Sequence, residues 1–304
     1  MQMAMTKLGK KKEDIVFISG IGCSSRFPYY MNTYGLHTIH GRAPAVATGL
    51  KLTNPNLEVW VITGDGDGLS IGGNHLIHAL RRNVNLNIVL FNNEIYGLTK
   101  GQYSPTSSVG TVTKSTPFGS VDQAFNPANL CIGAGTTFFA RTMDTDPKHM
   151  MEITKAASEH NGVSIIEIYQ NCVIFNDKVH DSYTNRKTRE ETTITVEHGR
   201  PLIFGKGKNL GIRLNGFTPE IVTIGENGIT EEDLLVHDET NPTLPLIYTQ
   251  FRGLGLPVPM GIFKKVEVPS FESDVVKQIE EVEHKKGKGS MEKLLKSGET
   301  WEVK

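Results

Sequence analysis

Two apolar segments of this 304-residue chain each end in polar residues that could bind a metal ion. Residues 59–63 lead directly into the sequence GDGDG at 64–68, and residues 87–91 lead into Asn92 and Asn93. If the two segments are neighbouring parallel strands, their polar ends lie at one edge of a sheet, where open α/β sheets bind ligands. Carboxylate and amide oxygens suit Mg²⁺, and glycine amides allow close approach of a phosphate. The pattern therefore predicts a site for a magnesium-bridged diphosphate.

The GDGDG segment is open to other interpretations. A dinucleotide-binding motif would need a third glycine where the chain has Leu69, and an EF-hand loop starting at Asp65 would need a carboxylate where it has Leu76. A phosphatase with Asp65 as nucleophile and Asp67 as acid is compatible with the spacing. A tight turn without any ligand is also compatible, because glycine and aspartate favour turns. Taken alone, the motif leaves the last two possibilities open.

The elements that must position these residues are typical of an α/β domain, with a mostly parallel sheet flanked by helices. Short β-branched runs alternate with longer mixed segments between residues 15 and 175. Apolar residues recur at helical spacing between Leu69 and Arg82, which predicts a helix there. The expected strands lie near residues 15–19, 57–63, 86–91 and 163–169.

The character of the chain changes after residue 180. Residues 181–191 are almost wholly polar, and residues 210–224 resemble two strands joined at Asn215-Gly216, a hairpin signature. A helix is expected over residues 272–284, followed by a basic, solvated tail. We therefore expect a main domain over residues 1–180 and a smaller C-terminal region, 181–304, with hairpins and a terminal helix.

Composition argues against several classes of protein. Thirty-two Lys and Arg residues against 33 Asp and Glu residues leave a formal net charge of −1, which gives no reason to expect nucleic acid or an anionic membrane as partner. No apolar run approaches the roughly 20 residues that cross a bilayer. Residues 1–12 lack the apolar centre of a signal peptide, so we expect a cytoplasmic protein.

Taken together, the motifs resemble those of a known enzyme family. Gly64-Asp65-Gly66, followed after residues 67–91 by Asn92-Asn93, resembles the thiamine diphosphate and magnesium motif. The sequence EIYGLTKGQYSPT at 94–106 is similar to the β subunit of 2-oxoacid:ferredoxin oxidoreductases, especially the 2-oxoglutarate type. So are GIGCSSR at 20–26 and TIHGRA at 38–43. The resemblance covers about residues 13 to 180 and implies that residues 1–180 form a thiamine diphosphate-binding domain.

The resemblance implies a magnesium site and a diphosphate site. The Asp65 carboxylate, the Asn93 side chain and the Ile95 carbonyl would hold Mg²⁺ in a shell made of oxygen atoms. Lys100 would offset the remaining negative charge of the cofactor, with an exposed loop lysine as the alternative. The residues expected near the cofactor, besides the magnesium ligands, are Cys23, His40, Gly64, Gly66, Asp67, Leu98, Thr99 and Lys100.

Three residues are catalytic candidates by the same resemblance. His40 would stand beside the cofactor, with a purely structural histidine as the alternative. Arg26 would contact the carboxylate of the 2-oxoacid through its guanidinium fork, with a surface salt bridge as the alternative. Lys148 is a weaker candidate for the same substrate contact.

The cysteines indicate an incomplete iron–sulfur site. Cys23, Cys131 and Cys172 contain no C-x-x-C pair, so they offer neither a disulfide framework nor four thiolates. Cys23 and Cys172 match two of the four family ligands of a 4Fe-4S cluster, and Cys131 is expected to be a buried, small apolar residue. Relatives carry a C-P-G-C motif and a helix before the stretch matching residues 8–15. We expect that this segment was lost or that the start is mispredicted, which would leave apolar surface exposed.

The implied activity is oxidative decarboxylation of a 2-oxoacid, 2-oxoglutarate by type, to an acyl-coenzyme A. Thiamine diphosphate would supply the carbanion chemistry, and electrons would pass through the cluster to ferredoxin. In the family, the glutamate that activates the cofactor comes from the α subunit, so the chain would be inactive alone and would work in at least a heterodimer. The alternative is a non-catalytic remnant that binds cofactor or a partner. The sequence does not decide between 2-oxoglutarate and pyruvate.

Overall fold

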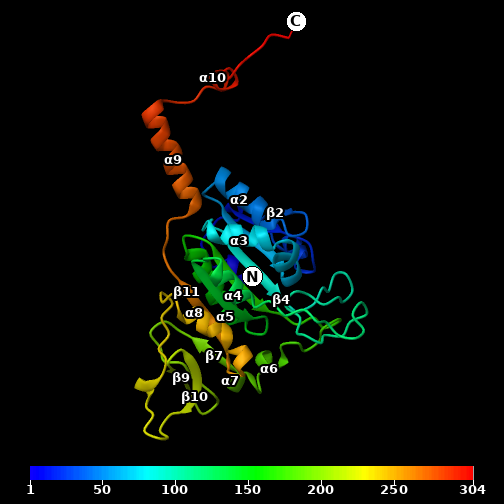
Figure 1. The fold of residues 1–304 in the computed structure, drawn as a ribbon, viewed down its shortest axis with the longest axis vertical. Coiled ribbons are helices and arrows are strands. Elements are labelled where there is room, and N and C mark those ends of the chain that lie inside the picture. The colour runs from blue at the N-terminus through cyan, green and yellow to red at the C-terminus, as the bar shows by residue number, and fades with distance from the viewer. Residues whose placement is uncertain (304) are drawn as a thin grey trace.

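The protein, seen here as a computed structural model, is described over residues 1–303 and centres on an eight-stranded sheet (Figure 1). The strand order is β2-β1-β3-β4-β6-β5-β11-β7. Every neighbouring pair is parallel except β11 and β5, which are antiparallel. The expected α/β class with a mostly parallel sheet is therefore confirmed.

The four strands expected from the sequence form the centre of this sheet. The strands in residues 1–180 are β1 (Ile15–Ser19), β2 (Tyr34–His37), β3 (Glu58–Gly64), β4 (Asn87–Asn92), β5 (Phe138–Met143) and β6 (Ser164–Tyr169). Of these, β1, β3, β4 and β6 match the predicted ranges to within a residue. They are buried along their length because helices cover both faces, which explains their continuous apolar runs.

Alternate side chains along the strands pack into two separate hydrophobic cores, one on each face of the sheet. In β1, Val16 and Ile18 pack in one cluster with α2 and α3, whereas Ile15 and Phe17 pack in the other with Trp60 and residues of α5. Successive side chains of a strand point to opposite faces, so one apolar strand serves both layers. The sheet is thereby held rigid, and its strand ends are fixed in position.

The helices that follow the strands begin at recognisable signals. The main ones are α2 (Ala43–Thr53), α3 (Gly73–Arg81), α4 (Pro127–Gly133) and α5 (Pro147–Glu159). Asn126 and Asp146 cap α4 and α5, since each side chain accepts a backbone N–H of the first turn. The helix predicted from Leu69 starts later, because a π-helical turn, Asp67–Ile71, comes first.

The C-terminal region contributes to the main sheet as well as forming its own. Strands β7 (Thr193–Val196) and β11 (Val258–Lys265) extend the large sheet, while β8 (Ile203–Phe204), β9 (Leu210–Asn215) and β10 (Thr218–Thr223) form a three-stranded sheet. The predicted hairpin is confirmed, and Gly216 at its turn has a φ of +65°. The proposed boundary at residue 180 stays a prediction.

The remaining elements are short or peripheral. The predicted terminal helix is confirmed as α9 (Phe271–Lys286), which projects from the body of the molecule (Figure 1). None of the helices in residues 1–303 has the length and apolar character that a bilayer crossing requires. Strand β2, which forms one edge of the large sheet, exposes Tyr34 and Leu36. The other helices are α1 (Gln2–Met5), α6 (Asp181–Thr184), α7 (Arg189–Thr192), α8 (Leu244–Gln250) and α10 (Met291–Leu295), with 3₁₀ turns at Lys12–Asp14, Ser24–Tyr30, Glu231–Asp233 and Arg252–Leu254.

Candidate functional site

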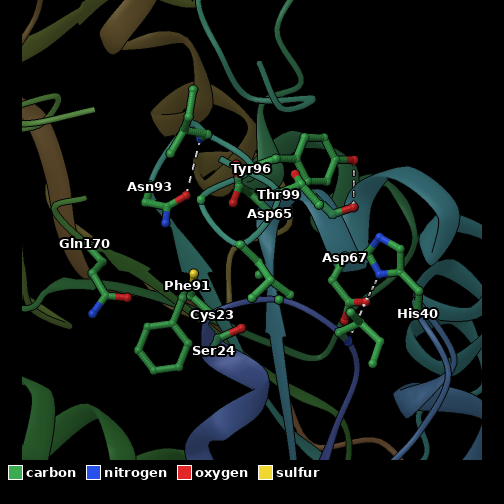
Figure 2. A pocket seen from close by; sticks show the side chains of 17 residues that line it. Cys23, Ser24, His40, Asp65, Asp67, Phe91, Asn93, Tyr96, Thr99 and Gln170 are labelled. Carbon is green, nitrogen blue, oxygen red and sulfur yellow. Dashed lines mark hydrogen bonds and ion pairs between the residues drawn. The ribbon is translucent and has the colours of Figure 1, made fainter. Parts of the chain in front are cut away.

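The ends of β3 and β4 bring the predicted metal-binding residues to one cavity. The two strands are parallel neighbours with Gly64 opposite Phe91, so Asp65 and Asn93 both leave the sheet at its carboxyl edge. Both residues, together with Ile95, line a cavity of about 140 Å³ (Figure 2). The two strands are therefore paired in parallel, as the sequence predicted.

Asp65 is a buried carboxylate that makes no ion pair with any side chain of residues 1–303. It is 3% exposed, and its Oδ2 accepts a 2.7 Å hydrogen bond from the Thr106 hydroxyl. Burial raises the pKa of Asp65 to about 6, partly opposed by hydrogen bonds from Ser104 and Thr106, and no positive side chain contributes to the shift. Because a buried carboxylate is stabilised by a nearby cation, this environment suits a divalent metal ion.

A polar network continues from Asp65 across the neighbouring strands β4, β6 and β5. The Thr106 hydroxyl lies 3.0 Å from Asn92 Oδ1, and the Asn92 amide donates to Glu167 at 2.9 Å. Glu167 in turn accepts a 2.7 Å bond from Arg141 Nε. Buried hydrogen bonds of this kind fix the orientation of a ligating group. Thr106 lies within the motif at 94–106, and only its hydroxyl in the Ser104-Pro105-Thr106 segment could have indicated this contact.

Asp67 organises the loops around the cavity. Its carboxylate accepts the N–H groups of Ile21 (3.1 Å) and Gly41 (2.7 Å) and the Thr63 hydroxyl (2.7 Å), and it contacts His40 Nδ1 at 2.5 Å. A carboxylate engaged in this way is poorly suited to the role of a free acid, so the phosphatase interpretation is not favoured. His40 itself lines the cavity with its ring held by Asp67 (Figure 2).

The loop after β4 forms the other wall. Gly66 lies directly against the Tyr96 ring, since a Cβ at Gly66 would be 2.2 Å from Tyr96 Cε1, and the Tyr96 hydroxyl donates to the Gly66 carbonyl. Leu98 and Thr99 line the cavity, but Lys100 is exposed, has a φ of +77° and is not part of the lining. The lining also includes residues for which the sequence predicted no role: Ile21, Gly22, Ser24, Phe91, Tyr96, Gly97 and Gln170.

Arg26 and Lys148 lie outside this cavity. Arg26 is exposed, with its guanidinium 5.9 Å from the Tyr30 ring. Lys148 lines a different groove and lies 4.0 Å from the Glu152 carboxylate. The described chain does not bring either side chain to Asp65 and Asn93, and their substrate contacts remain predictions.

Two of the three cysteines converge beside the cavity. A Cβ at Gly97 would lie 3.3 Å from Cys23 Sγ and 3.6 Å from Cys172 Sγ, so both sulfurs flank the same glycine. Cys131 is fully buried in the core, as expected, and burial raises the pKa of its thiol. Residues 1–303 contain no group of three or more His, Cys, Asp or Glu side chains placed to hold a metal ion. The two neighbouring sulfurs are fewer than the four thiolates that an iron–sulfur cluster normally needs.

Comparison with known proteins agrees with this geometry. Residues 20–168 match the family model described as the thiamine pyrophosphate enzyme, C-terminal TPP binding domain. This range includes the loops of Cys23 and His40 and the ends of both β3 and β4.

Similar proteins extend the match to nearly the whole chain. The 2-oxoglutarate oxidoreductase subunit KorB of Mycobacterium tuberculosis is 47% identical over 304 residues, covering 98% of this chain and 81% of that protein. The 2-oxoacid:ferredoxin oxidoreductase subunit beta of Saccharolobus solfataricus is 47% identical over 178 residues, 58% of each chain. A solved 2-oxoglutarate:ferredoxin oxidoreductase from Magnetococcus marinus, with 2-oxoglutarate, coenzyme A and succinyl-CoA bound, aligns with a TM-score of 0.74 and 32% identity, covering 98% of this chain and 87% of that one.

Proposed function

This chain belongs to the family of 2-oxoacid:ferredoxin oxidoreductase β subunits, and from that premise we propose that its cavity holds Mg²⁺ and the diphosphate end of thiamine diphosphate. The observation that carries the proposal is the placement of Asp65 and Asn93 at the carboxyl ends of two adjacent parallel strands, on one cavity.

The residues present fit these groups. One carboxylate, one amide oxygen and one backbone carbonyl, from Asp65, Asn93 and Ile95, form the oxygen donor set that magnesium prefers, with remaining positions left for phosphate and water. A cavity of about 140 Å³ is smaller than the roughly 300 to 1,000 Å³ typical of sites that enclose a whole organic ligand. We infer that this chain encloses the diphosphate end and that another subunit covers the rest of the cofactor.

Each side chain has a defined task in this arrangement. When bound, thiamine diphosphate supplies carbanion stabilisation for decarboxylation of the substrate. Asp65 orients the metal ion from its buried position, and Gly66 permits close approach of the backbone beside Tyr96. His40 faces the cavity with Nδ1 held by Asp67, which leaves Nε2 to meet the cofactor or substrate. Leu98 and Thr99 contact the cofactor from the exposed side, and Arg26 is assigned to the substrate carboxylate.

Cys23 and Cys172 are proposed to supply two thiolates to a 4Fe-4S cluster. Their sulfurs flank Gly97, which has no side chain to occupy the space between them. Cluster ligation by cysteine normally needs four thiolates, so the remaining two would come from residues other than the described cysteines. The cluster would carry electrons from the cofactor site to ferredoxin.

The relatives point to the substrate and the partner. Proteins named for 2-oxoglutarate are among the most similar, and the solved relative holds 2-oxoglutarate and coenzyme A. We propose that this chain acts on 2-oxoglutarate with coenzyme A and pairs with an α subunit that completes the cofactor site. The cytoplasmic location expected from composition is part of the same proposal.

Calorimetric titration with thiamine diphosphate and Mg²⁺ tests the binding site. We expect saturable binding in the parent chain and none in Asp65→Ala or Asn93→Ala. Asp274→Ala, an exposed carboxylate on α9, is the matched control and should bind as the parent does. Unchanged binding in Asp65→Ala would contradict the proposal.

Co-expression with the α subunit tests the activity. We expect viologen reduction that requires both 2-oxoglutarate and coenzyme A, with pyruvate as the competing substrate. Cofactor binding without any such reduction would instead favour a non-catalytic remnant, the second interpretation that the incomplete cysteine set raised.

A further inference from the structure

A second polar cavity lies on the opposite side of Asn92 and Thr106 from the cofactor site. Its volume is about 420 Å³, and it shares no lining residue with the cofactor cavity. Three charged side chains line it: Arg141 from β5, Glu167 from β6, and Arg252 from the turn after α8. Each arginine is paired with one carboxylate, Arg141 with Glu167 and Arg252 with Glu94, and each guanidinium keeps further N–H groups that an anion could accept.

Arg141 is held rigidly at the base of this cavity. The side chain is 4% exposed, and its Nε donates to Glu167 at 2.7 Å. Its guanidinium lies between two aromatic rings, 5.2 Å from the Tyr169 centroid and 5.1 Å from the Phe263 centroid. Stacking and the ion pair together fix the plane of the guanidinium before any ligand arrives.

The terminal edge of this guanidinium makes no hydrogen bond to the described part of the chain. Within residues 1–303, neither Nη atom of Arg141 makes a hydrogen bond, and neither is sealed from solvent in the way that Trp60 Nε1 is. Charged N–H groups in a buried setting need an acceptor, because an unsatisfied donor costs free energy. The cavity that Arg141 lines has room for that acceptor.

Arg252 adds a second cation at the same cavity. One of its nitrogens, Nη1, donates to Glu94 at 2.7 Å, and the side chain is 39% exposed. The positive charge of Arg252 acts against that of Arg141, so the two guanidinium groups repel each other across the cavity. An anion between them would relieve this repulsion. The neutral polar side chains that complete the lining include those of Ser108, Asn126 and Gln250.

We propose that this cavity binds the carboxylate of a small organic acid, with Arg141 presenting its planar Nη edge and Arg252 closing the site from the exposed side. The planar fork of arginine matches a carboxylate with two parallel hydrogen bonds. The volume leaves room for the carbon chain of the acid. The site is separate from the cofactor cavity and does not depend on the activity proposed above.

Titration of the full chain with succinate, followed by calorimetry at constant ionic strength, tests the proposal. Replacing Arg252 alone would leave Glu94, which is 3% exposed, buried without its ion-pair partner, so the first variant is the double change Arg252→Gln with Glu94→Gln. We expect saturable binding to the parent chain that weakens about tenfold or more in this variant, as loss of one charged hydrogen bond predicts. Replacing Arg141 alone would leave Glu167 buried without its partner, so the second variant is the double change Arg141→Gln with Glu167→Gln. This neutral pair should also lose binding while remaining folded by circular dichroism.

Arg82→Gln is the control, because Arg82 is exposed and lines neither cavity. It should bind succinate as the parent chain does. Loss of succinate binding in Arg26→Gln, at the residue assigned to the 2-oxoacid, with full binding in the double variant of Arg252 and Glu94 would place the acid elsewhere and overturn the proposal. Absence of saturable binding to the parent chain, or tighter binding of inorganic phosphate than of succinate, would also overturn it.

Discussion

The Thr106 hydroxyl donates a 2.7 Å hydrogen bond to the Asp65 carboxylate, joining two residues that are 41 positions apart in the chain. Asp65 follows β3, whereas Thr106 belongs to the long loop after β4. The bond therefore closes that loop onto the proposed metal ligand and sets the direction in which the carboxylate points.

We expect Thr106→Val to weaken Mg²⁺ binding in the presence of thiamine diphosphate by roughly 10- to 100-fold, the usual cost of losing a partner of a metal ligand. Thr106→Ser keeps the hydroxyl and should restore most of the affinity. Thr113→Val, in the same loop but away from Asp65, is the control. Magnesium titrations by calorimetry give the affinities, and equal affinity in Thr106→Val and the parent would refute the role.

Gly66→Ala should disrupt the cavity because the new methyl group would meet the Tyr96 ring at 2.2 Å. The ring would have to move, breaking its hydrogen bond to the Gly66 carbonyl. We expect a loss of about 1 to 3 kcal/mol in the free energy of unfolding, together with weaker cofactor binding. Gly73→Ala, where no atom lies within 4 Å of the added Cβ, should be neutral or stabilising in the same urea titration.

Asp67→Asn tests whether the carboxylate positions His40. An asparagine can still accept a hydrogen bond from a backbone N–H, but it lacks the charge that holds the His40 ring. In the enzyme with its α subunit, we expect kcat to fall by about 100-fold or more, the low end of what an oriented acid–base residue contributes. Cofactor affinity should change much less. Thr63→Val removes another of the Asp67 donors and serves as comparison, and an equally large fall in kcat there would argue for a structural role alone.

The three thiols should differ in reactivity when the chain is prepared without iron. Cys23 is exposed and Cys172 is half-buried, whereas Cys131 is buried and burial raises the pKa of its thiol. We expect a thiol reagent to label Cys23 and Cys172 in the native chain and Cys131 only after unfolding. Mass spectrometry of labelled peptides identifies the sites, and rapid native labelling of Cys131 would show that the core differs from the one described.

His237 should make stability depend on pH. The ring is buried, with Nδ1 2.9 Å from the Tyr248 hydroxyl and Nε2 2.8 Å from the Ile262 carbonyl, and burial lowers its pKa. In the unfolded chain a histidine titrates near 6.5, so the unfolded state binds the proton first as pH falls. The stability that neutral His237 contributes is therefore complete above about pH 6.5 and is lost as pH falls from there through the folded-state pKa.

The free energy of unfolding should therefore be lower at pH 5.5 than at pH 7.5, and its slope against pH should be shallower in His237→Gln. Asp65, whose pKa is raised, contributes with the opposite sign, but it is common to both proteins and cancels in the comparison. Urea denaturation at several pH values measures the slopes. Identical slopes would mean that His237 takes up its proton equally in both states.

The local sequence determined where the central strands and the hairpin turn of this protein form. The apolar runs of β1, β3, β4 and β6 are readable because a strand buried on both faces needs continuous apolar residues, and the Asn215-Gly216 turn is readable because glycine adopts positive φ there. The adjacency of Asp65 and Asn93 followed from parallel pairing. The short strand β2, with four exposed residues, carries no such signal.

Only the tertiary structure decided which distant groups meet. Residues from separate elements form the contacts of both cavities. Thr106 bonds to Asp65, four donors surround Asp67, and two sulfurs lie beside Gly97. At the second cavity, Arg141 stacks on aromatic rings. It also left Arg26 and Lys148 outside the cavity. Residue types and spacing specify the elements because backbone preference and burial act locally. Side-chain contacts across the sheet depend on how those elements pack, which no short stretch of sequence contains.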